Sequence, residues 1–240
     1  MKLSILYIFI FLAFLSCNKN DELQTLSPIN SISIEVPEPS GMCFNNFLDC
    51  FYIVGDSTKS VYRLNLLGQL IAEYQDVGND LEGISFNPDN SSFLIAEEKN
   101  RAIIEIDILG NVLSTNNVSG MNLDNKGLEG ITYNTNNQHI YLLNEEDPGQ
   151  LIELDTNFVT LNTYDLDFAA DYSGICYNNI EDNFWVVSEE SKLIVKCDLF
   201  GNSIQKYKIN EEKTEGIVFV NNTIYLVSDS ESKIYIYSLE

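Results

Sequence analysis

The sequence predicts an all-β fold, a five-bladed β-propeller of four-stranded antiparallel blades. The first observation behind this prediction is a motif of glycine, an apolar residue, a variable residue and an aromatic residue. It recurs five times, as Gly41-Met42-Cys43-Phe44, Gly83-Ile84-Ser85-Phe86, Gly130-Ile131-Thr132-Tyr133, Gly174-Ile175-Cys176-Tyr177 and Gly216-Ile217-Val218-Phe219. The glycines are 42, 47, 44 and 42 residues apart. A period of 40–50 residues made of short strands is typical of propeller blades.

The second observation is the order of short strands within one repeat. In the third repeat, strands are expected at 130–134, 140–144, 151–155 and 159–166. The turn between the first two, at 135–137, is Thr-Asn-Asn, which is rich in residues that accept a positive φ. Tyr52, Tyr141 and Trp185 occupy one position of the second strand, where we expect them to pack between blades.

The third observation is a turn motif between the third and fourth strands. It reads Asp107-Ile108-Leu109-Gly110-Asn111 and Asp198-Leu199-Phe200-Gly201-Asn202, with a related form at Asn65-Leu66-Leu67-Gly68-Gln69. An acid or amide opens each turn, and the glycine supplies the left-handed conformation that a tight hairpin needs.

The fifth repeat ends at Glu240, after its third strand. The alternating segment 31–36, before the first glycine, is the candidate for its missing fourth strand. We therefore expect the N-terminal strand to close the ring, which leaves no open edge between the first and last blades.

The N-terminal segment predicts export and a lipid anchor. Lys2 precedes an apolar run at 3–15 that is short for a membrane-spanning helix, and Leu15-Ser16-Cys17 resembles a bacterial lipobox. We expect a signal peptide at 1–16, lipidation of Cys17, a polar tether at 17–30 and the propeller at 31–240. An ordinary signal peptide with a chance cysteine is the alternative. The expected location is the cell envelope, on either the periplasmic or the surface side.

Composition limits the partners. The chain has 36 acidic and 13 basic residues and a formal net charge of −23. Such a surface repels nucleic acid and anionic lipids and attracts cations, so membrane contact is expected through the lipid alone. A monomer that binds a small ligand or an envelope protein is the expected form.

Cysteine and histidine suggest little chemistry. Cys43, Cys50, Cys176 and Cys197 show no metal-ligand spacing, and we expect buried free thiols, although Cys43 and Cys50 flank one turn and a disulfide between them stays open. His139 is the only histidine, and we expect it to be exposed and incidental.

Two columns of residues point to one end of the propeller axis. Just before the repeat glycines stand Ser40, Glu82, Glu129, Ser173 and Glu215, and after the second strands stand Asp56, Glu98, Glu145, Glu189 and Asp229. Because the first two strands of a blade are antiparallel, both columns lie at the same end. Crowded carboxylates repel one another unless they are protonated or a cation neutralises them. Oxygen ligands without His or Cys favour Ca²⁺, with Mg²⁺ second.

A structural interpretation of the same columns is also open. A basic residue follows the second-strand acid in four blades, namely Lys59, Arg101, Lys192 and Lys233. These residues predict surface ion pairs within each hairpin, each worth about 0–1 kcal/mol. The glutamates before the glycines would then cap backbone N–H groups.

Several of these motifs resemble the SdiA-regulated (YjiK-like) β-propeller family. The resemblance is carried by Leu81-Glu82-Gly83-Ile84, Leu128-Glu129-Gly130-Ile131, Ser188-Glu189-Glu190 and the turn at 198–202, and it spans about residues 30–240. It implies a secreted or lipid-anchored propeller. The Leu-Glu-Gly-Ile segments are also similar to those of esterase-like phytase and gluconolactonase-type propellers, in which this glutamate helps to hold a divalent metal. That similarity applies to Glu82, Glu129 and Glu215, while Ser40 and Ser173 depart from it.

Two functions follow as expectations. The first is a binding propeller of the cell envelope with Ca²⁺ at its acidic mouth, and we favour it over an enzyme. The alternative is a metal-dependent hydrolase of phosphoesters or lactones at the same site. Phosphate chemistry calls for several converging bases, and this chain has few.

Overall fold

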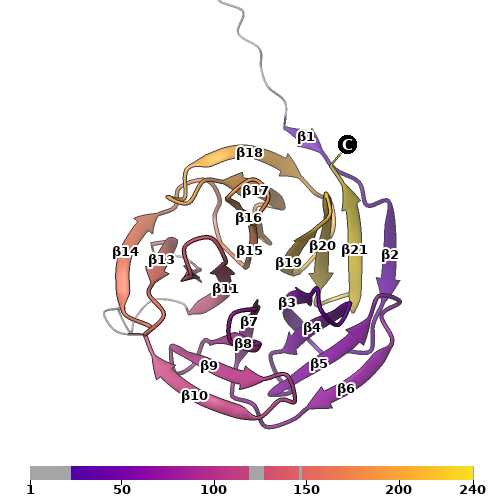
Figure 1. The fold of residues 1–240 in the computed structure, drawn as a ribbon. Helices are drawn as coiled ribbons and strands as arrows, with labels where there is room; N and C mark the ends of the chain where they lie inside the picture. The colour runs from indigo at the N-terminus through magenta and orange to yellow at the C-terminus, as the bar shows by residue number, and fades with distance from the viewer. Residues whose placement is uncertain (1–22, 119–126, 146–147, 240) are drawn as a thin grey trace, which may run out of the picture.

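The computed structural model describes residues 23–118, 127–145 and 148–239, and these form five blades around one axis (Figure 1). Every blade has four antiparallel strands, which run in sequential order from the axis outwards in blades 1 to 4, while the outermost strand of blade 5 comes from the N-terminal segment. The predicted five-bladed all-β propeller is confirmed. The strands are β3 (Pro39–Asn45), β4 (Cys50–Gly55), β5 (Ser60–Asn65) and β6 (Leu70–Tyr74) in blade 1; β7 (Leu81–Asn87), β8 (Ser92–Glu97), β9 (Ala102–Asp107) and β10 (Val112–Asn117) in blade 2; β11 (Leu128–Asn134), β12 (His139–Asn144), β13 (Gln150–Leu154) and β14 (Thr160–Asp165) in blade 3; β15 (Gly174–Asn178), β16 (Asn183–Ser188), β17 (Leu193–Cys197) and β18 (Ser203–Lys208) in blade 4; and β19 (Thr214–Val220), β20 (Thr223–Ser228), β21 (Lys233–Ser238) and β2 (Asn30–Ser33) in blade 5.

The N-terminal strand closes the ring, as the sequence predicts. β2 pairs antiparallel with β21, with Asn30 opposite Ile236 and Ser33 opposite Lys233. A shorter strand before it, β1 (Gln24–Thr25), pairs in parallel with the outer edge of β18.

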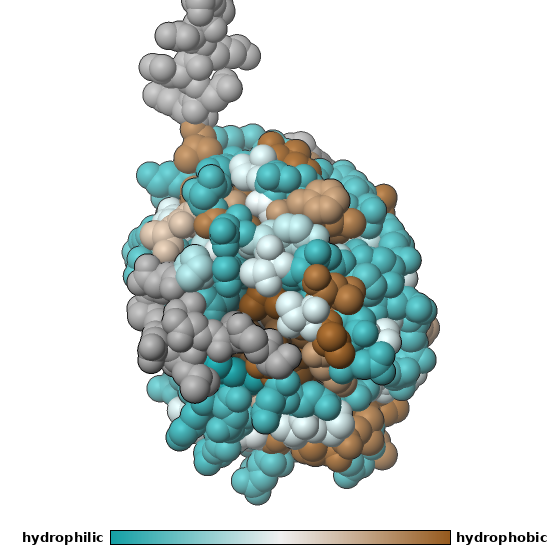
Figure 2. Space-filling model, turned by 90° about the vertical axis from the view of Figure 1, so that its left-hand side faces the viewer, coloured by the Kyte–Doolittle hydropathy of each residue, from teal (hydrophilic) through white to brown (hydrophobic). Residues whose placement is uncertain are grey.

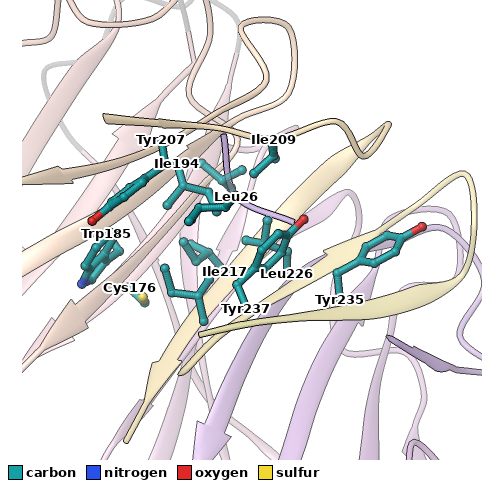
Figure 3. Close-up of a cluster of buried hydrophobic side chains, with 12 residues drawn as sticks. Leu26, Cys176, Trp185, Ile194, Tyr207, Ile209, Ile217, Leu226, Tyr235 and Tyr237 are labelled. Atoms are coloured by element: carbon teal, nitrogen blue, oxygen red, sulfur yellow. The ribbon is translucent and has the colours of Figure 1, made fainter. Parts of the chain in front are cut away.

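The propeller takes in part of the segment expected to be a tether. Leu26 inserts between blades 4 and 5, beside Tyr207, Ile209 and Tyr237, and is only 7% exposed (Figure 3). The expected signal peptide at 1–16, Cys17 and the start of the tether lie outside the described residues. No helix among the described residues is of the length and hydropathy needed to span a membrane.

The core consists of apolar clusters between neighbouring blades. Tyr52 and Phe93 join blades 1 and 2 with ring centroids 4.1 Å apart, and Trp185 stacks on Phe219 of blade 5 at 5.7 Å. Tyr52, Tyr141 and Trp185 are almost fully buried, which confirms their predicted packing role. Seen from the side of β14, the rim is mostly hydrophilic and is interrupted by apolar patches (Figure 2).

The turns between third and fourth strands follow their sequence motif. Gly68, Gly110 and Gly201 have φ values of 78°, 86° and 81°. The opening acid accepts backbone hydrogen bonds within the turn, as when Asp107 Oδ1 accepts from the N–H of Leu109 at 2.8 Å.

The repeat glycines form a ring where the first strands come closest to the axis. A Cβ atom on Gly83 would lie 2.8 Å from the backbone nitrogen of Ile131, and one on Gly216 would lie 2.7 Å from that of Met42. Real Cβ atoms do not approach backbone so closely, so glycine is needed for adjacent blades to meet there. Only about 10 Å³ of space remains at this neck, which divides the channel into two chambers.

The residues two positions after the glycines join neighbouring blades. Ser85 Oγ accepts a hydrogen bond from the N–H of Tyr133 at 3.0 Å, and Thr132 Oγ1 accepts one from the N–H of Tyr177 at 3.0 Å. Cys43 and Cys176 accept in the same way from the backbones of Phe86 and Phe219. Val218, in the fifth blade, has no acceptor to offer.

All four described cysteines are buried free thiols, as expected. Burial raises the pKa of the Cys197 thiol to about 12 and raises the pKa of Cys43 and Cys176 still further.

Candidate functional site: an acidic chamber on one side of the glycine neck

The second-strand acids come directly after the last residue of their strands, in all five blades. Their backbones are fixed by a repeated hydrogen bond. The N–H of Asp56 donates to the carbonyl of Glu38 at 3.1 Å, that of Glu98 to Asp80 at 2.9 Å, and that of Asp229 to Lys213 at 2.9 Å. This bond ties the end of the second strand to the segment that leads into the first.

The two predicted columns meet at a cavity of about 420 Å³. Of the eight acids expected as metal ligands, seven line it: Asp56, Glu82, Glu129, Glu145, Glu189, Glu215 and Asp229. Glu98 is not in the lining, and its Oε1 accepts a hydrogen bond from the N–H of Gly127 at 3.0 Å.

A third column of residues, which was not among the predicted site residues, lies at the same end of the propeller. Three residues before the repeat glycines stand Glu38, Asp80, Gly127, Asp171 and Lys213. Glu38, Asp80 and Lys213 have positive φ values of 41°, 60° and 50°, a conformation that turns the chain sharply into the first strand. Extending the comparison of the five repeats by three residues upstream would have found this column.

One group from this column completes a set of carboxylates that can hold a metal ion. One oxygen each from Asp56, Asp80 and Glu82 lie within 4.8 Å of one another, and all three residues are half-buried. Asp56 comes from the end of β4 in blade 1, while Asp80 and Glu82 come from the start of β7 in blade 2. The site therefore spans two blades, and the identity of a metal is not fixed by this geometry.

The carboxylates of the chamber are electrostatically strained in the absence of a cation. Burial, followed by a hydrogen bond and repulsion from Asp80, raises the pKa of Asp56 to about 6. Burial and the neighbouring Asp56 raise the pKa of Glu82 to about 9, and burial and Glu82 raise the pKa of Glu129 to about 10. Burial and Glu189 raise the pKa of Glu215 to about 7. Near neutral pH Glu82 and Glu129 therefore hold protons that a bound cation would displace, whereas Glu215 is partly ionised and Asp56 mostly so.

The chamber is uneven in charge. Lys213 is the only basic residue of the described lining, and its Nζ lies 3.6 Å from Glu189 Oε2. Lys213 also opposes the upward shifts in the pKa of Glu215 and Asp229. Its side of the chamber is therefore partly neutralised, whereas the side formed by Asp56, Glu82 and Glu129 has no base in the lining.

Asp171 lines the chamber but has a structural role. Its side chain is buried and accepts hydrogen bonds from the hydroxyls of Ser173 and Ser188 and from the N–H groups of Glu189 and Glu190. A carboxylate with this many donors is satisfied without a metal.

The ion pairs proposed within single hairpins differ from the observed ones. Lys192 pairs with Glu212, in the next blade's approach segment, and Lys233 pairs with Glu231 at 2.7 Å. The second-strand acids Glu189 and Asp229 are not their partners. The second-strand acids of these two blades are therefore not explained by the lysine that follows them.

His139 was expected to be exposed and incidental, and this expectation is wrong. It is half-buried, and its Nδ1 lies 2.7 Å from Glu153 Oε1. Glu153 also accepts hydrogen bonds from Tyr141 and Asn162, so the histidine completes a polar cluster within blade 3.

Comparisons with solved structures show the same fold. Virginiamycin B lyase from Staphylococcus aureus is 17% identical with a TM-score of 0.55, over 84% of this chain and 66% of that chain. A chain of a nidogen/laminin complex is 12% identical with a TM-score of 0.61, over 79% of this chain and 72% of that one. A streptogramin B lyase is 14% identical with a TM-score of 0.56, over 87% and 72%. At these identities the likeness shows the fold alone, and this chain spans about two thirds of the first lyase.

A search of curated protein sequences finds no match. The sequence model of one family, described as SdiA-regulated, matches residues 21–238, which is nearly the whole chain. The chain therefore belongs to the SdiA-regulated family of β-propellers.

Proposed function

We propose that this protein is a binding propeller of the cell envelope that holds a Ca²⁺ ion in the acidic chamber and uses the mouth to bind a small ligand or an envelope protein. The observation that carries the proposal is the group of Asp56, Asp80 and Glu82, with ligand oxygens within 4.8 Å of one another. Glu129 also lines the chamber and is a candidate for a further ligand, because burial and then repulsion from Glu82 raise the pKa of its carboxyl group.

Calcium suits this donor set better than other metals. The lining has no histidine or cysteine, so hard oxygen-binding cations are favoured over zinc or copper. Ca²⁺ accepts 6–8 oxygen ligands in flexible geometry, whereas Mg²⁺ requires a near-ideal octahedron. Carboxylates that come from two separate blades fit the flexible coordination geometry of Ca²⁺ better than the strict octahedron of Mg²⁺.

A bound ion would leave coordination positions for a ligand. Three carboxylates supply only part of the 6–8 oxygens that Ca²⁺ takes, and the chamber opens to solvent. An oxygen-bearing ligand would meet a cation surrounded by negative charge, which selects against strongly anionic molecules.

The hydrolase alternative uses the same site and remains the second candidate. Lys213 is the observation in its favour, because it is a base in the described lining that can contact an anionic substrate. One base is few for phosphoryl transfer, which relies on several charges to stabilise the transferred group. Binding is therefore the better supported function.

The envelope location rests on the sequence of the N-terminal segment. A lipid on Cys17 would anchor a monomer to the membrane, and the net charge of −23 opposes any other contact with anionic lipid or with nucleic acid.

Calorimetric titration with Ca²⁺ of the purified protein tests the proposal. We expect about one ion per chain, loss of binding in the double variant Glu82→Gln/Glu129→Gln, and unchanged binding in Glu35→Gln, which removes an exposed acid outside the chamber. Absence of heat in the wild type, or equal binding in the double variant, would contradict it. Turnover of phosphoesters or lactones that is lost in the double variant would favour the hydrolase instead.

A further inference from the structure

The chamber on the other side of the glycine neck differs in chemistry from the acidic one. It lies at the far ends of the same first strands and has a volume of about 320 Å³. Its walls come from the residues that follow each repeat glycine, so every blade contributes. The aromatic residue three positions after the glycine lines it in all five blades: Phe44, Phe86, Tyr133, Tyr177 and Phe219.

No charged residue lines this chamber in the described chain. The layer nearest the neck is aliphatic, with Met42, Ile84, Ile131 and Ile175. The tyrosine hydroxyls are engaged elsewhere, because Tyr133 donates to Asp89 at 2.6 Å and Tyr177 donates to Asp182 at 2.6 Å. The chamber therefore combines ring and hydrocarbon surface with uncharged polar groups, which include Ser85 and Thr132 in the wall and turn residues at the rim.

The aromatic walls are held by rings behind them. Phe86 packs on Phe93 with centroids 5.2 Å apart, and Tyr177 packs on Phe184 at 5.8 Å. Phe219 stacks on Trp185 at 5.7 Å with an interplanar angle of 10°. The pocket is thus formed before a ligand arrives, which lowers the entropic cost of binding.

The mouth carries an exposed ring that can cover a ligand. Phe47, in the turn after β3, is 75% exposed although it lines the chamber, and its ring meets Phe86 edge-on at 6.0 Å. The rest of the rim is formed by uncharged turn residues, including Asn46, Thr135 and Asn179.

We infer that this aromatic chamber is a second binding site, which takes a small, uncharged molecule with an aromatic ring. A preformed cavity of about this size, lined by aromatic and aliphatic side chains together with uncharged polar groups, is the usual form of a small-molecule site. Burial of apolar surface drives the binding, at about 25 cal/mol per Å². A charged molecule would lose its hydration without gaining a partner, so charge is selected against. Because the neck separates the chambers, this site acts independently of the proposed calcium site.

Titration with N-phenyl-1-naphthylamine, an uncharged probe that fluoresces in apolar sites, tests the inference. We expect about one probe per chain and a change in the emission of Trp185, the only tryptophan, which contacts the wall through Phe219. Anilinonaphthalene sulfonate has the same ring system with a charge, and we expect it to bind at least about tenfold more weakly.

Variants of exposed residues locate the probe without a risk to folding. Phe47→Ala and the double variant Thr135→Glu/Asn179→Glu should each weaken binding several-fold. Ile180→Ala, a matched control, removes an apolar side chain that is 71% exposed and lies next to Asn179 in the turn after β15, outside the lining. Its affinity should equal that of the wild type. Failure of the wild type to bind, equal affinity for both probes, or equal loss in Ile180→Ala would overturn the inference.

Calcium and chelator should leave the affinity for the probe unchanged. An affinity that depends on calcium would overturn the independence of the two sites.

Discussion

Gly41 of blade 1 and Glu82 of blade 2 lie backbone to backbone, so a Cβ atom on Gly41 would overlap the carbonyl oxygen of Glu82. This contact connects the neck to the acidic chamber, because Glu82 is also part of the proposed metal site. The repeated glycine therefore reflects the closeness of adjacent blades. Its conformation alone does not require glycine here, since the structure gives Gly41 no positive φ.

Gly41→Ala should destabilise the protein by about 1–3 kcal/mol, because the blades must move apart to admit the methyl group. Gly130→Ala is the control within the same ring. Its Cβ would meet Ile175 Cγ2 at 3.0 Å and Leu143 Cδ1 at 3.1 Å, and such side chains can shift. The nearest backbone atom, the nitrogen of Ile175, would lie at 3.2 Å, which is a tight contact but not an overlap. Thermal melts should show a larger fall for Gly41→Ala, at about 2–4 °C per kcal/mol. Equal melts would contradict the role of the backbone contact.

Val218→Thr should stabilise the protein by about 0.5–1.5 kcal/mol. The variant supplies the acceptor that Ser85 and Thr132 provide in their blades, directed at the backbone of the next blade, where the matching residue is Phe44. Val195→Thr is the control, since it places a hydroxyl in a fully buried core position without such a partner, and it should destabilise. Denaturant unfolding measures both, and a destabilised Val218→Thr would show that the fifth blade does not follow the pattern.

In chelator, stability should fall as the pH rises from about 5 to 8, because Glu82 and Glu129, with folded pKa values of about 9 and 10, keep protons over this whole range that the unfolded chain has released. Two further groups add to the fall in its lower part. The pKa values of Asp56 and Glu215 are raised to about 6 and 7 in the folded state, so that state holds protons that the unfolded chain has already released. The stability contributed by these groups is complete below their unfolded pKa values and is lost as the pH passes through the folded ones. One extra proton changes the free energy of unfolding by about 1.4 kcal/mol per pH unit. Melts in calcium should show a smaller decline, and an equal decline would count against a cation in the chamber.

Lys213→Gln should raise calcium affinity by about two- to tenfold, because the described lining then loses its only base. The exchange leaves Glu189 without the partner that lies 3.6 Å away. Lys196→Gln is the control, because it also removes a lysine paired with a glutamate, but one outside the lining. Calorimetry compares the calcium affinities of the two variants. If the affinity does not rise in Lys213→Gln, Lys213 has no influence on the proposed calcium site.

Asp171→Ala should lower stability by about 2 kcal/mol or more while leaving calcium stoichiometry unchanged. Its carboxylate accepts hydrogen bonds from two hydroxyls and two backbone N–H groups, and of these donors the N–H of Glu189 also has a second acceptor, Ser173 Oγ at 3.2 Å. Loss of the carboxylate therefore leaves most of these buried donors unsatisfied. Asp80→Ala provides the contrast, because Asp80 belongs to the candidate metal group. That variant should lose calcium affinity. If Asp171→Ala lost calcium affinity and Asp80→Ala kept it, Asp171 would be the metal ligand and Asp80 would not.

Much of the architecture was predictable because each blade repeats the same local rules. The glycine motif gave the number of blades, and the alternating segment at 31–36 gave the closing strand, which the structure places at Asn30–Ser33. The packing of Leu26 between blades 4 and 5 was not predictable, because none of the five repeats contains an equivalent residue.

The acidic end was predictable as a region but its internal differences were not. Seven of the eight expected acids line the chamber. Asp80 was missed because it lies outside the strands that were aligned, and Glu98 turns to the N–H of Gly127 for a reason that only the three-dimensional contact reveals. The partners of Lys192 and Lys233 likewise depend on contacts that the hairpin order does not specify.

The pairing of β2 with β21 also governs the order of events during synthesis. A ribosome makes Asn30–Ser33 before the strands of blades 1 to 4 and Lys233–Ser238 after them, so the closing strand waits for all of these strands before its partner exists. Pairings so distant along the chain form slowly. Until β2 and β21 pair, the closing strand and the outer edge of β21 remain open to pairing with other chains. The newly made protein is thus most exposed to aggregation just before its last blade is completed.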